Sequence, residues 1–193
     1  MTHLLSVLAL VVLASGVLAM EPTTKPAAPS TLGFVVKDIA GNDYDLSQLR
    51  GKVVVIVNVA SKCGMTPQYA ALEALYRKHR ERGLVVVGFP ANNFGGQEPG
   101  TDEQIRAFCS EKYDVTFPMM SKISVKGDDK HPLYAFLTSK ETAGEFAGEI
   151  QWNFTKFVVG RDGKLMGRFA PNVKPTDPAF VELIEAALEN AAK

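Results

Sequence analysis

One continuous segment sets the architecture of this chain: Val53-Val54-Val55-Ile56-Val57-Asn58-Val59-Ala60-Ser61-Lys62-Cys63-Gly64-Met65-Thr66-Pro67. Its first seven residues lack apolar–polar alternation, which predicts a strand covered on both faces. Thr66 as a cap and Pro67 in a first turn predict a helix directly afterwards. Cys63 therefore lies at a strand-to-helix junction, where helix N–H groups and Lys62 favour a thiolate over a thiol. Because the thiolate is the nucleophilic form, Cys63 is a candidate catalytic residue.

The residues that follow predict a strand–helix–strand unit. Leu72, Leu75 and Tyr76 recur at helical spacing, and Gly83 is a typical C-terminal stop. Residues 84–89 then form a second apolar run. A unit of this kind places its two strands parallel, with a right-handed crossover.

The other predicted elements complete a recognisable order. They are a hairpin over 34–46, a helix over 101–113 that begins with a Thr101–Gln104 capping box, a hairpin over 154–169 and a helix from 177. This order is that of an α/β thioredoxin-like fold, with a central mixed sheet flanked by helices and an N-terminal hairpin. In such sheets the functional groups gather at the carboxyl ends of the strands, where Cys63 lies.

Composition and charge restrict the functional classes. The chain has 193 residues, of which 46% are hydrophobic, and this suits one globular domain with a substantial core. Its 21 basic residues balance 21 acidic ones, so the basic footprint of a nucleic-acid-binding protein is missing. The densest basic run, at 77–82, reads as a solvated helix end rather than a docking patch.

The N-terminus has the character of a targeting segment. Residues 4–19 are almost wholly apolar and carry no charge, and Val17 and Ala19 suit a signal-peptidase site. We therefore predict a signal peptide over 1–19, a flexible linker over 20–31 and a folded domain over 32–193. The prediction implies export, to a periplasm or a comparable space, without membrane insertion after cleavage. The alternative is an uncleaved membrane anchor, for which the apolar run is short.

Three separate segments carry a resemblance to a known family. They are Asn58-Val59-Ala60-Ser61-Lys62-Cys63-Gly64, Phe89-Pro90-Ala91-Asn92-Asn93-Phe94-Gly95-Gly96-Gln97-Glu98-Pro99, and Trp152-Asn153-Phe154. In order and spacing they resemble the signature stretches of glutathione peroxidases, and the resemblance covers residues 32–190. It implies a thioredoxin-like fold, reduction of hydrogen peroxide and of organic or lipid hydroperoxides, and a catalytic tetrad of Cys63, Gln97, Trp152 and Asn153.

The chemistry needs these residue types. A thiolate attacks one peroxide oxygen, the other departs as an alkoxide, and Cys63 becomes a sulfenic acid. The Trp152 indole and the Gln97 and Asn153 amides are uncharged donors that can stabilise both the thiolate and the leaving oxygen. Each also has a structural alternative: an inert buried cysteine, a turn glutamine, a packing tryptophan and a strand-capping asparagine. Their joint occurrence in matching segments favours catalysis.

Cys109 has two interpretations. Its position beside Ile105, Phe108 and the Lys112 stem on one helix face indicates a buried structural cysteine. The resemblance instead implies a resolving cysteine, as in thioredoxin-dependent family members. Together they predict a Cys63–Cys109 disulfide that forms after oxidation, when the helix opens locally. A permanent structural disulfide is the remaining alternative in an exported protein.

Departures from the family pattern refine the expectation. Sulfur stands at Cys63, where many relatives have selenocysteine, and Ala91 replaces an additional cysteine. The short segment before Trp152 implies a monomer of the phospholipid-hydroperoxide type. The implied reductant is a thioredoxin-like protein or glutathione. We expect no cofactor and, because His3, His79 and His131 are scattered, no metal.

Two other functions fit the same fold. One is thiol–disulfide exchange, against which the segment Cys63-Gly64-Met65-Thr66 counts, because Thr66 stands where a Cys-x-x-Cys motif has its second cysteine. The other is a non-catalytic redox sensor.

Overall fold

A computed structural model describes residues 30–190 of the chain. The predicted signal peptide at 1–19, and all but the last two residues of the predicted linker, lie outside the described residues. Thr31 is buried, and its backbone N–H donates to the Gly163 carbonyl at 3.3 Å. The Ser30 hydroxyl donates to the same carbonyl at 3.4 Å. The folded domain therefore includes at least two residues before the predicted start at 32.

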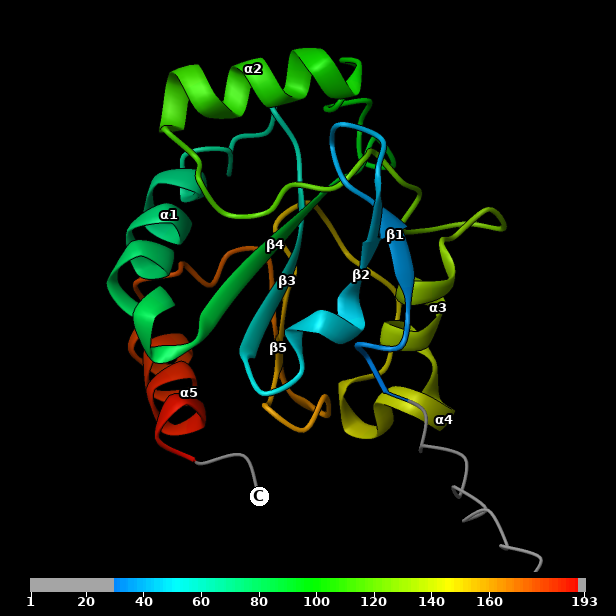
Figure 1. The fold of residues 1–193 in the computed structure, drawn as a ribbon. Coiled ribbons are helices and arrows are strands. Elements are labelled where there is room, and N and C mark those ends of the chain that lie inside the picture. Colours follow the sequence, from blue (N-terminus) through cyan, green and yellow to red (C-terminus); the bar gives the residue numbers. More distant parts are fainter. Residues whose placement is uncertain (1–29, 191–193) are drawn as a thin grey trace, which may run out of the picture.

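A four-stranded mixed sheet, in the order β4-β3-β5-β6, forms the centre of the domain (Figure 1). Strand β3 (Val53–Val59) pairs in parallel with β4 (Leu84–Pro90) and antiparallel with β5 (Lys156–Val159). Strand β6 (Leu165–Phe169) pairs antiparallel with β5. Every residue of β3 is buried, which confirms the strand predicted from its uninterrupted apolar run.

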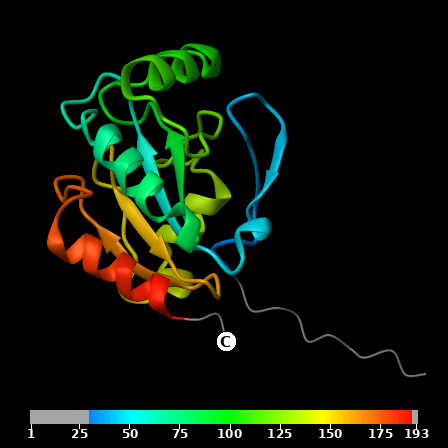
Figure 2. The same cartoon turned by 60° about the vertical axis from the view of Figure 1, so that its left-hand side comes forward.

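Helices cover both faces of this sheet. Helices α1 (Gln68–His79) and α5 (Pro178–Glu189) lie together on one face, where Leu72 and Ile184 join the β3 valines in one core cluster (Figures 1 and 2). Helix α3 (Pro132–Thr138) lies on the other face and contributes to a second cluster. The order and layers confirm a thioredoxin-like fold.

A small N-terminal hairpin precedes the sheet, as predicted. Strand β1 (Val35–Lys37) pairs antiparallel with β2 (Asp43–Asp45). Leu46 was predicted to extend the second strand, but it begins a 3-10 turn, η1 (Leu46–Leu49). The Asp45 side chain accepts the Ser47 N–H at 2.8 Å, and this cap turns the chain out of the strand.

Helix α2 (Asp102–Tyr113) crosses the end of the molecule toward which β3 and β4 run (Figure 1). The predicted capping box is confirmed: the Thr101 hydroxyl accepts the Gln104 N–H, and the Gln104 side chain accepts the Thr101 N–H. Ile105 and Cys109 are its two fully buried residues. The Lys112 stem was predicted to lie on the same face, but Lys112 is exposed. Phe108 and Tyr113 of α2 are partly buried and pack against the same core cluster.

Short elements complete the chain. Gly83, at a φ of 98°, ends the 3-10 turn η2 (Arg80–Arg82) that follows α1. Helix α4 (Lys140–Ala143) and the 3-10 turn η3 (Gly144–Phe146) follow α3; none of these three was predicted. Strand β5 begins two residues later than predicted because Phe154 has a φ of 66°, which a strand cannot contain. Across residues 30–190, no helix has both the length and the apolar character needed to cross a membrane.

Candidate active site

Cys63 lies in a tight turn between β3 and α1. The Thr66 hydroxyl accepts the Cys63 N–H at 3.0 Å and donates to the Ala60 carbonyl at 2.8 Å, so that one side chain closes the turn. The Met65 N–H points at Cys63 Sγ, at 3.4 Å. The thiol is 7% exposed. The turn thus holds the sulfur nearly buried, with one backbone donor directed at it.

The helix start differs from the prediction. Helix α1 begins at Gln68, five residues after Cys63, and Pro67 occupies the N-cap position without a side-chain cap. Thr66 was predicted to cap the helix, but its hydroxyl is used within the Cys63 turn. The donor at the sulfur therefore comes from the turn, not from the first turn of α1.

Gln97 is held beside this turn by the loop that follows β4. Gly95 and Gly96 have φ values of 62° and 63°, a left-handed pair that reverses the chain just before Gln97. The Gln97 carbonyl accepts the Lys62 N–H at 3.0 Å. This backbone bond joins the residue before Cys63 directly to Gln97.

Asn153 and Trp152 enter from the segment before β5. The fully buried Asn153 donates from Nδ2 to Gln97 Oε1 at 3.0 Å. Trp152 is 38% exposed, and its ring lies 5.5 Å from that of Phe94, centroid to centroid. The Asn153 amide is thus fixed inside the protein, and the Trp152 indole lies at the surface above the Gly-rich loop.

The predicted residues are therefore brought together in part by direct contacts. The structure joins the Cys63 turn to Gln97, and Gln97 to Asn153. Within residues 30–190, the hydrogen bond to Cys63 Sγ is the one from Met65, and none links this sulfur to the side chains of Gln97, Trp152 or Asn153. The dithiol state of the protein therefore holds the Gln97–Asn153 amide pair against the Cys63 turn, with no hydrogen bond from the pair to the sulfur.

Asn58 is a supporting residue that we did not predict. It is fully buried in β3, donates from Nδ2 to the Trp152 carbonyl at 3.2 Å, and accepts the Phe154 N–H at its own carbonyl at 2.6 Å. These bonds clamp the Trp152–Asn153 segment to the end of β3. The sequence signal was available, since Asn58 is the one polar residue in an apolar strand.

Cys109 lies on α2 and is 2% exposed. Burial raises the pKa of its thiol to about 11, and the nearby Glu98 carboxylate adds to that rise, while the Tyr69 hydroxyl opposes it. Both cysteines are free thiols in the structure. The helix thus keeps Cys109 protonated and out of solvent.

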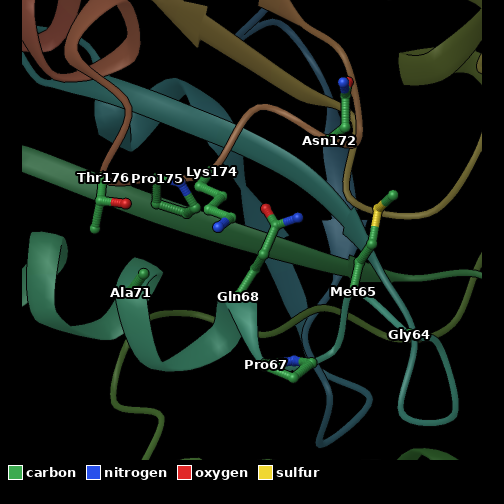
Figure 3. A pocket seen from close by; sticks show the side chains of 9 residues that line it. All are labelled: Gly64, Met65, Pro67, Gln68, Ala71, Asn172, Lys174, Pro175 and Thr176. Atoms are coloured by element: carbon green, nitrogen blue, oxygen red, sulfur yellow. The ribbon is translucent and has the colours of Figure 1, made fainter.

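A pocket of about 360 Å³ adjoins the Cys63 turn (Figure 3). Met65, Pro67, Ala71 and Pro175 supply much of its apolar lining, and Gln68 and Lys174 are polar residues along it. Figure 3 shows Met65, in the turn before α1, and Gln68, at the start of α1, projecting toward the 172–176 loop. The pocket therefore offers an apolar surface beside the reactive turn.

A buried lysine anchors the loop that forms the far wall of this pocket. Lys156 Nζ donates to the Pro171 and Val173 carbonyls at 3.2 and 2.5 Å, and burial lowers the pKa of this amine to about 8. Gln68 Nε2 donates to the Pro171 carbonyl as well, at 2.8 Å. The loop is thereby tied to both β5 and α1.

The part of the chain that the structure describes contains no cluster of three or more His, Cys, Asp or Glu side chains that could hold a metal ion. His79 Nε2 lies 3.3 Å from Glu185 Oε1.

A cysteine at the end of the central parallel strand of a thioredoxin fold defines the class of thiol-dependent oxidoreductases. The fold has solved relatives: a thiol:disulfide interchange protein of the thioredoxin family from Chlorobium tepidum TLS is 19% identical, with a TM-score of 0.60 over 83% of this chain and 98% of that one. At this identity the likeness concerns the fold alone.

Closer matches identify the family. The glutathione peroxidase family model matches residues 31–138. The chain is 46% identical over 178 residues to the "Thioredoxin/glutathione peroxidase BtuE" of Escherichia coli strain K12, covering 82% of this chain and 97% of that protein. The crystal structure of Trgpx in apo form is 42% identical, with a TM-score of 0.69 over 86% of this chain and all of that one. The chain belongs to the glutathione peroxidase family, and it is a thiol peroxidase that reduces hydroperoxides with electrons from a thiol.

Proposed function

We propose that Cys63 is the peroxidatic nucleophile and that Gln97, Trp152 and Asn153 stabilise the charge it transfers. The observation that carries this proposal is a pair of hydrogen bonds at Gln97. Its backbone carbonyl accepts the N–H of Lys62 in the Cys63 turn, and its side-chain oxygen accepts the Asn153 amide N–H. The Cys63 thiolate attacks one peroxide oxygen, the O–O bond breaks, and the second oxygen leaves as an alkoxide that takes up a proton. Cys63 becomes a sulfenic acid.

The three donors suit this step because they carry no charge. A fixed amide or indole N–H can face a negative sulfur and then a negative leaving oxygen without changing its own protonation. The burial of Asn153 keeps its amide in place, and the partial exposure of Trp152 leaves a route for peroxide. No histidine is needed for this chemistry.

We assign Cys109 as the resolving cysteine. Its sulfur would attack the Cys63 sulfenic acid and form a disulfide, with loss of water. Because α2 buries only Ile105 and Cys109 completely, and Phe108 and Tyr113 in part, the helix can open locally while the rest of the core stays folded. Opening of α2 is therefore part of the proposed cycle.

Peptide mass spectrometry after one equivalent of peroxide tests this assignment. We expect a Cys63–Cys109 disulfide in the wild type and none in Cys109→Ser. Overoxidised Cys63 beside a free Cys109 thiol in the wild type would contradict it. A lower melting temperature of the reduced protein than of the oxidised protein would instead indicate a structural disulfide.

The electron donor is proposed to be a thioredoxin-like protein rather than glutathione. A resolving disulfide supports this choice, since a dithiol reductant can reduce it directly. The E. coli relative carries both reductants in its name. Steady-state turnover with each reductant tests the choice, and equal or faster turnover with glutathione would contradict it.

The pocket beside Cys63 supports organic hydroperoxides as substrates. Its apolar lining suits a hydrocarbon chain better than hydrogen peroxide. We expect Ala71→Phe to lower kcat/KM for a fatty-acid hydroperoxide at least fivefold while leaving hydrogen peroxide turnover unchanged. Ala74→Phe is the matched control, because Ala74 is an exposed residue of the same helix and does not line the pocket. Equal losses for both peroxides in Ala71→Phe would contradict the assignment.

Three further parts of the proposal concern the whole protein. We propose that it is exported by the signal peptide at 1–19, works as a monomer, and uses no cofactor beyond the external thiol. N-terminal sequencing of the mature protein and its mass in solution test the first two. Activity after chelation tests the third, and a loss that a metal restores would contradict it.

A further inference from the structure

A buried carboxyl group lies between the two cysteine-bearing segments. Glu98 is 1% exposed and directly follows Gln97. Its Oε2 accepts a hydrogen bond from the Ser61 hydroxyl at 3.1 Å, two residues before Cys63, and its backbone N–H donates to Asn92 Oδ1 at 2.8 Å. Among residues 30–190, no lysine or arginine forms an ion pair with this carboxylate, although Lys122 Nζ donates to the Glu98 backbone carbonyl at 3.3 Å. A buried and unpaired carboxylate is costly, and such groups are often functional.

The other side of Glu98 faces α2. A pocket of about 450 Å³ has Ser61, Lys62 and Glu98 on one wall and Gln104, Ile105 and Phe108 of α2 on the other. Ile105 lies one helical turn before Cys109, on the same buried face. The pocket therefore connects the Cys63 turn with the face of α2 that carries Cys109.

A third buried group completes the cluster. Tyr69 of α1 is fully buried, its hydroxyl has no hydrogen-bond partner in the described part of the chain, and it lies near enough to Cys109 to affect the pKa of that thiol. The Glu98 charge raises the pKa of both Cys109 and Tyr69, so the three groups lie within electrostatic reach of one another. The proposed peroxidatic step does not use this arrangement.

The resolving step needs a base that removes the Cys109 proton, and Glu98 in this cluster is such a base. With a pKa of about 11, Cys109 has almost no thiolate at neutral pH, although the thiolate is the attacking form. Burial raises the pKa of Glu98, which makes it a stronger base than an exposed carboxylate, while Lys62 and Lys122 favour its charged form.

We propose that Glu98 is the general acid–base residue of the resolving step, an inference that rests on the proposed role of Cys109. As α2 opens, the Glu98 carboxylate accepts the Cys109 S–H proton. The Cys109 sulfur attacks Sγ of the Cys63 sulfenic acid, the S–S bond forms and the S–O bond breaks. The departing hydroxide takes the proton from Glu98 and leaves as water, so Glu98 ends the step as a carboxylate.

Single-turnover stopped flow separates this role from peroxide reduction. The signal is the fluorescence of Trp152, the one tryptophan of the chain. The rate of the first phase, Cys63 oxidation, depends on peroxide concentration, whereas the rate of the second, disulfide formation, does not. We expect Glu98→Gln to keep the first rate within about threefold of wild type and to slow the second at least about tenfold. Glu103→Gln, the same change at an exposed position of α2, is the matched control and leaves both rates unchanged.

The pH profile of the second phase is the decisive readout, since a merely structural role would not change its shape. In the wild type the protein supplies the base, so we expect this rate to stay flat from about pH 7 to 9. In Glu98→Gln we expect it to rise about tenfold per pH unit, because hydroxide must then remove the proton. Matching profiles in the two proteins would overturn the proposal.

Two further results keep the test conclusive. If Glu98→Gln does not fold, the wild type alone decides: a flat profile with a solvent deuterium isotope effect supports the proposal, and a flat profile without one, or a tenfold rise per pH unit, overturns it. A wild-type protein that oxidises at Cys63 but shows no second phase would instead remove the resolving role of Cys109, and the Glu98 proposal with it.

Discussion

At the scale of single residues, the site depends on uncharged groups held by their neighbours. Thr66 closes the Cys63 turn, Asn58 clamps the segment before β5, and Asn153 bonds to Gln97. Trp152 is the residue whose role is least constrained by contacts, since its ring packs on Phe94 and its indole N–H can serve as a donor.

Trp152→Phe separates these two roles. Phenylalanine keeps an aromatic ring against Phe94 but lacks the N–H, so we expect the rate of peroxide consumption to fall at least about tenfold with little change in melting temperature. Trp152→Ala is the comparison that removes both. A wild-type rate in Trp152→Phe would mean that Trp152 acts only in packing.

At the scale of elements, α2 is the part that the mechanism requires to move. Thr101→Ala removes the side-chain cap on the Gln104 N–H and should destabilise the helix by about 1 kcal/mol. Because opening precedes disulfide formation, we expect the resolving phase to become roughly fivefold faster. Hydrogen exchange of the α2 amides verifies the destabilisation, and Thr101→Ser serves as the conservative control. Faster exchange without faster resolution would show that the helix need not open.

Most of these elements could be predicted from the sequence, for identifiable reasons. Strand β3 has an unbroken apolar run, and Thr101 and Gln104 mark the start of α2. Helices α3 and α4 were missed because they are only 7 and 4 residues long, too short for a periodic pattern. Phe154 was placed in a strand because nothing in the sequence reveals a left-handed conformation at a non-glycine residue.

The site residues were less predictable from the sequence alone than the helices and strands. Residue chemistry alone singled out Cys63, whereas Gln97, Trp152 and Asn153 depended on resemblance, since 56 residues separate Gln97 from Asn153. Glu98 was quoted within a motif but given no role, because its burial arises from contacts with Ser61 and α2 that are distant in the chain.

At the scale of the whole molecule, the buried Cys109 thiol couples stability to pH. Its pKa is about 11 in the folded protein and about 9 when unfolded, so the folded state holds the proton more tightly. This contribution is complete below about pH 9 and is lost as the pH rises to about 11. Relative to Cys109→Ala, we expect the wild-type free energy of unfolding to fall by about 2–3 kcal/mol across that range. Urea unfolding under reducing conditions measures it, and parallel pH curves would contradict the burial of this thiol.

The central claim is that Cys63 is the sulfur that peroxide oxidises. The most direct measurement is the second-order rate at which the reduced protein consumes hydrogen peroxide, in wild type, Cys63→Ser and Cys109→Ser. We predict a wild-type rate at least about a thousandfold above that of free cysteine, the same first step in Cys109→Ser, and none in Cys63→Ser. A wild-type rate equal to that of free cysteine, or undiminished consumption by Cys63→Ser, would contradict the account.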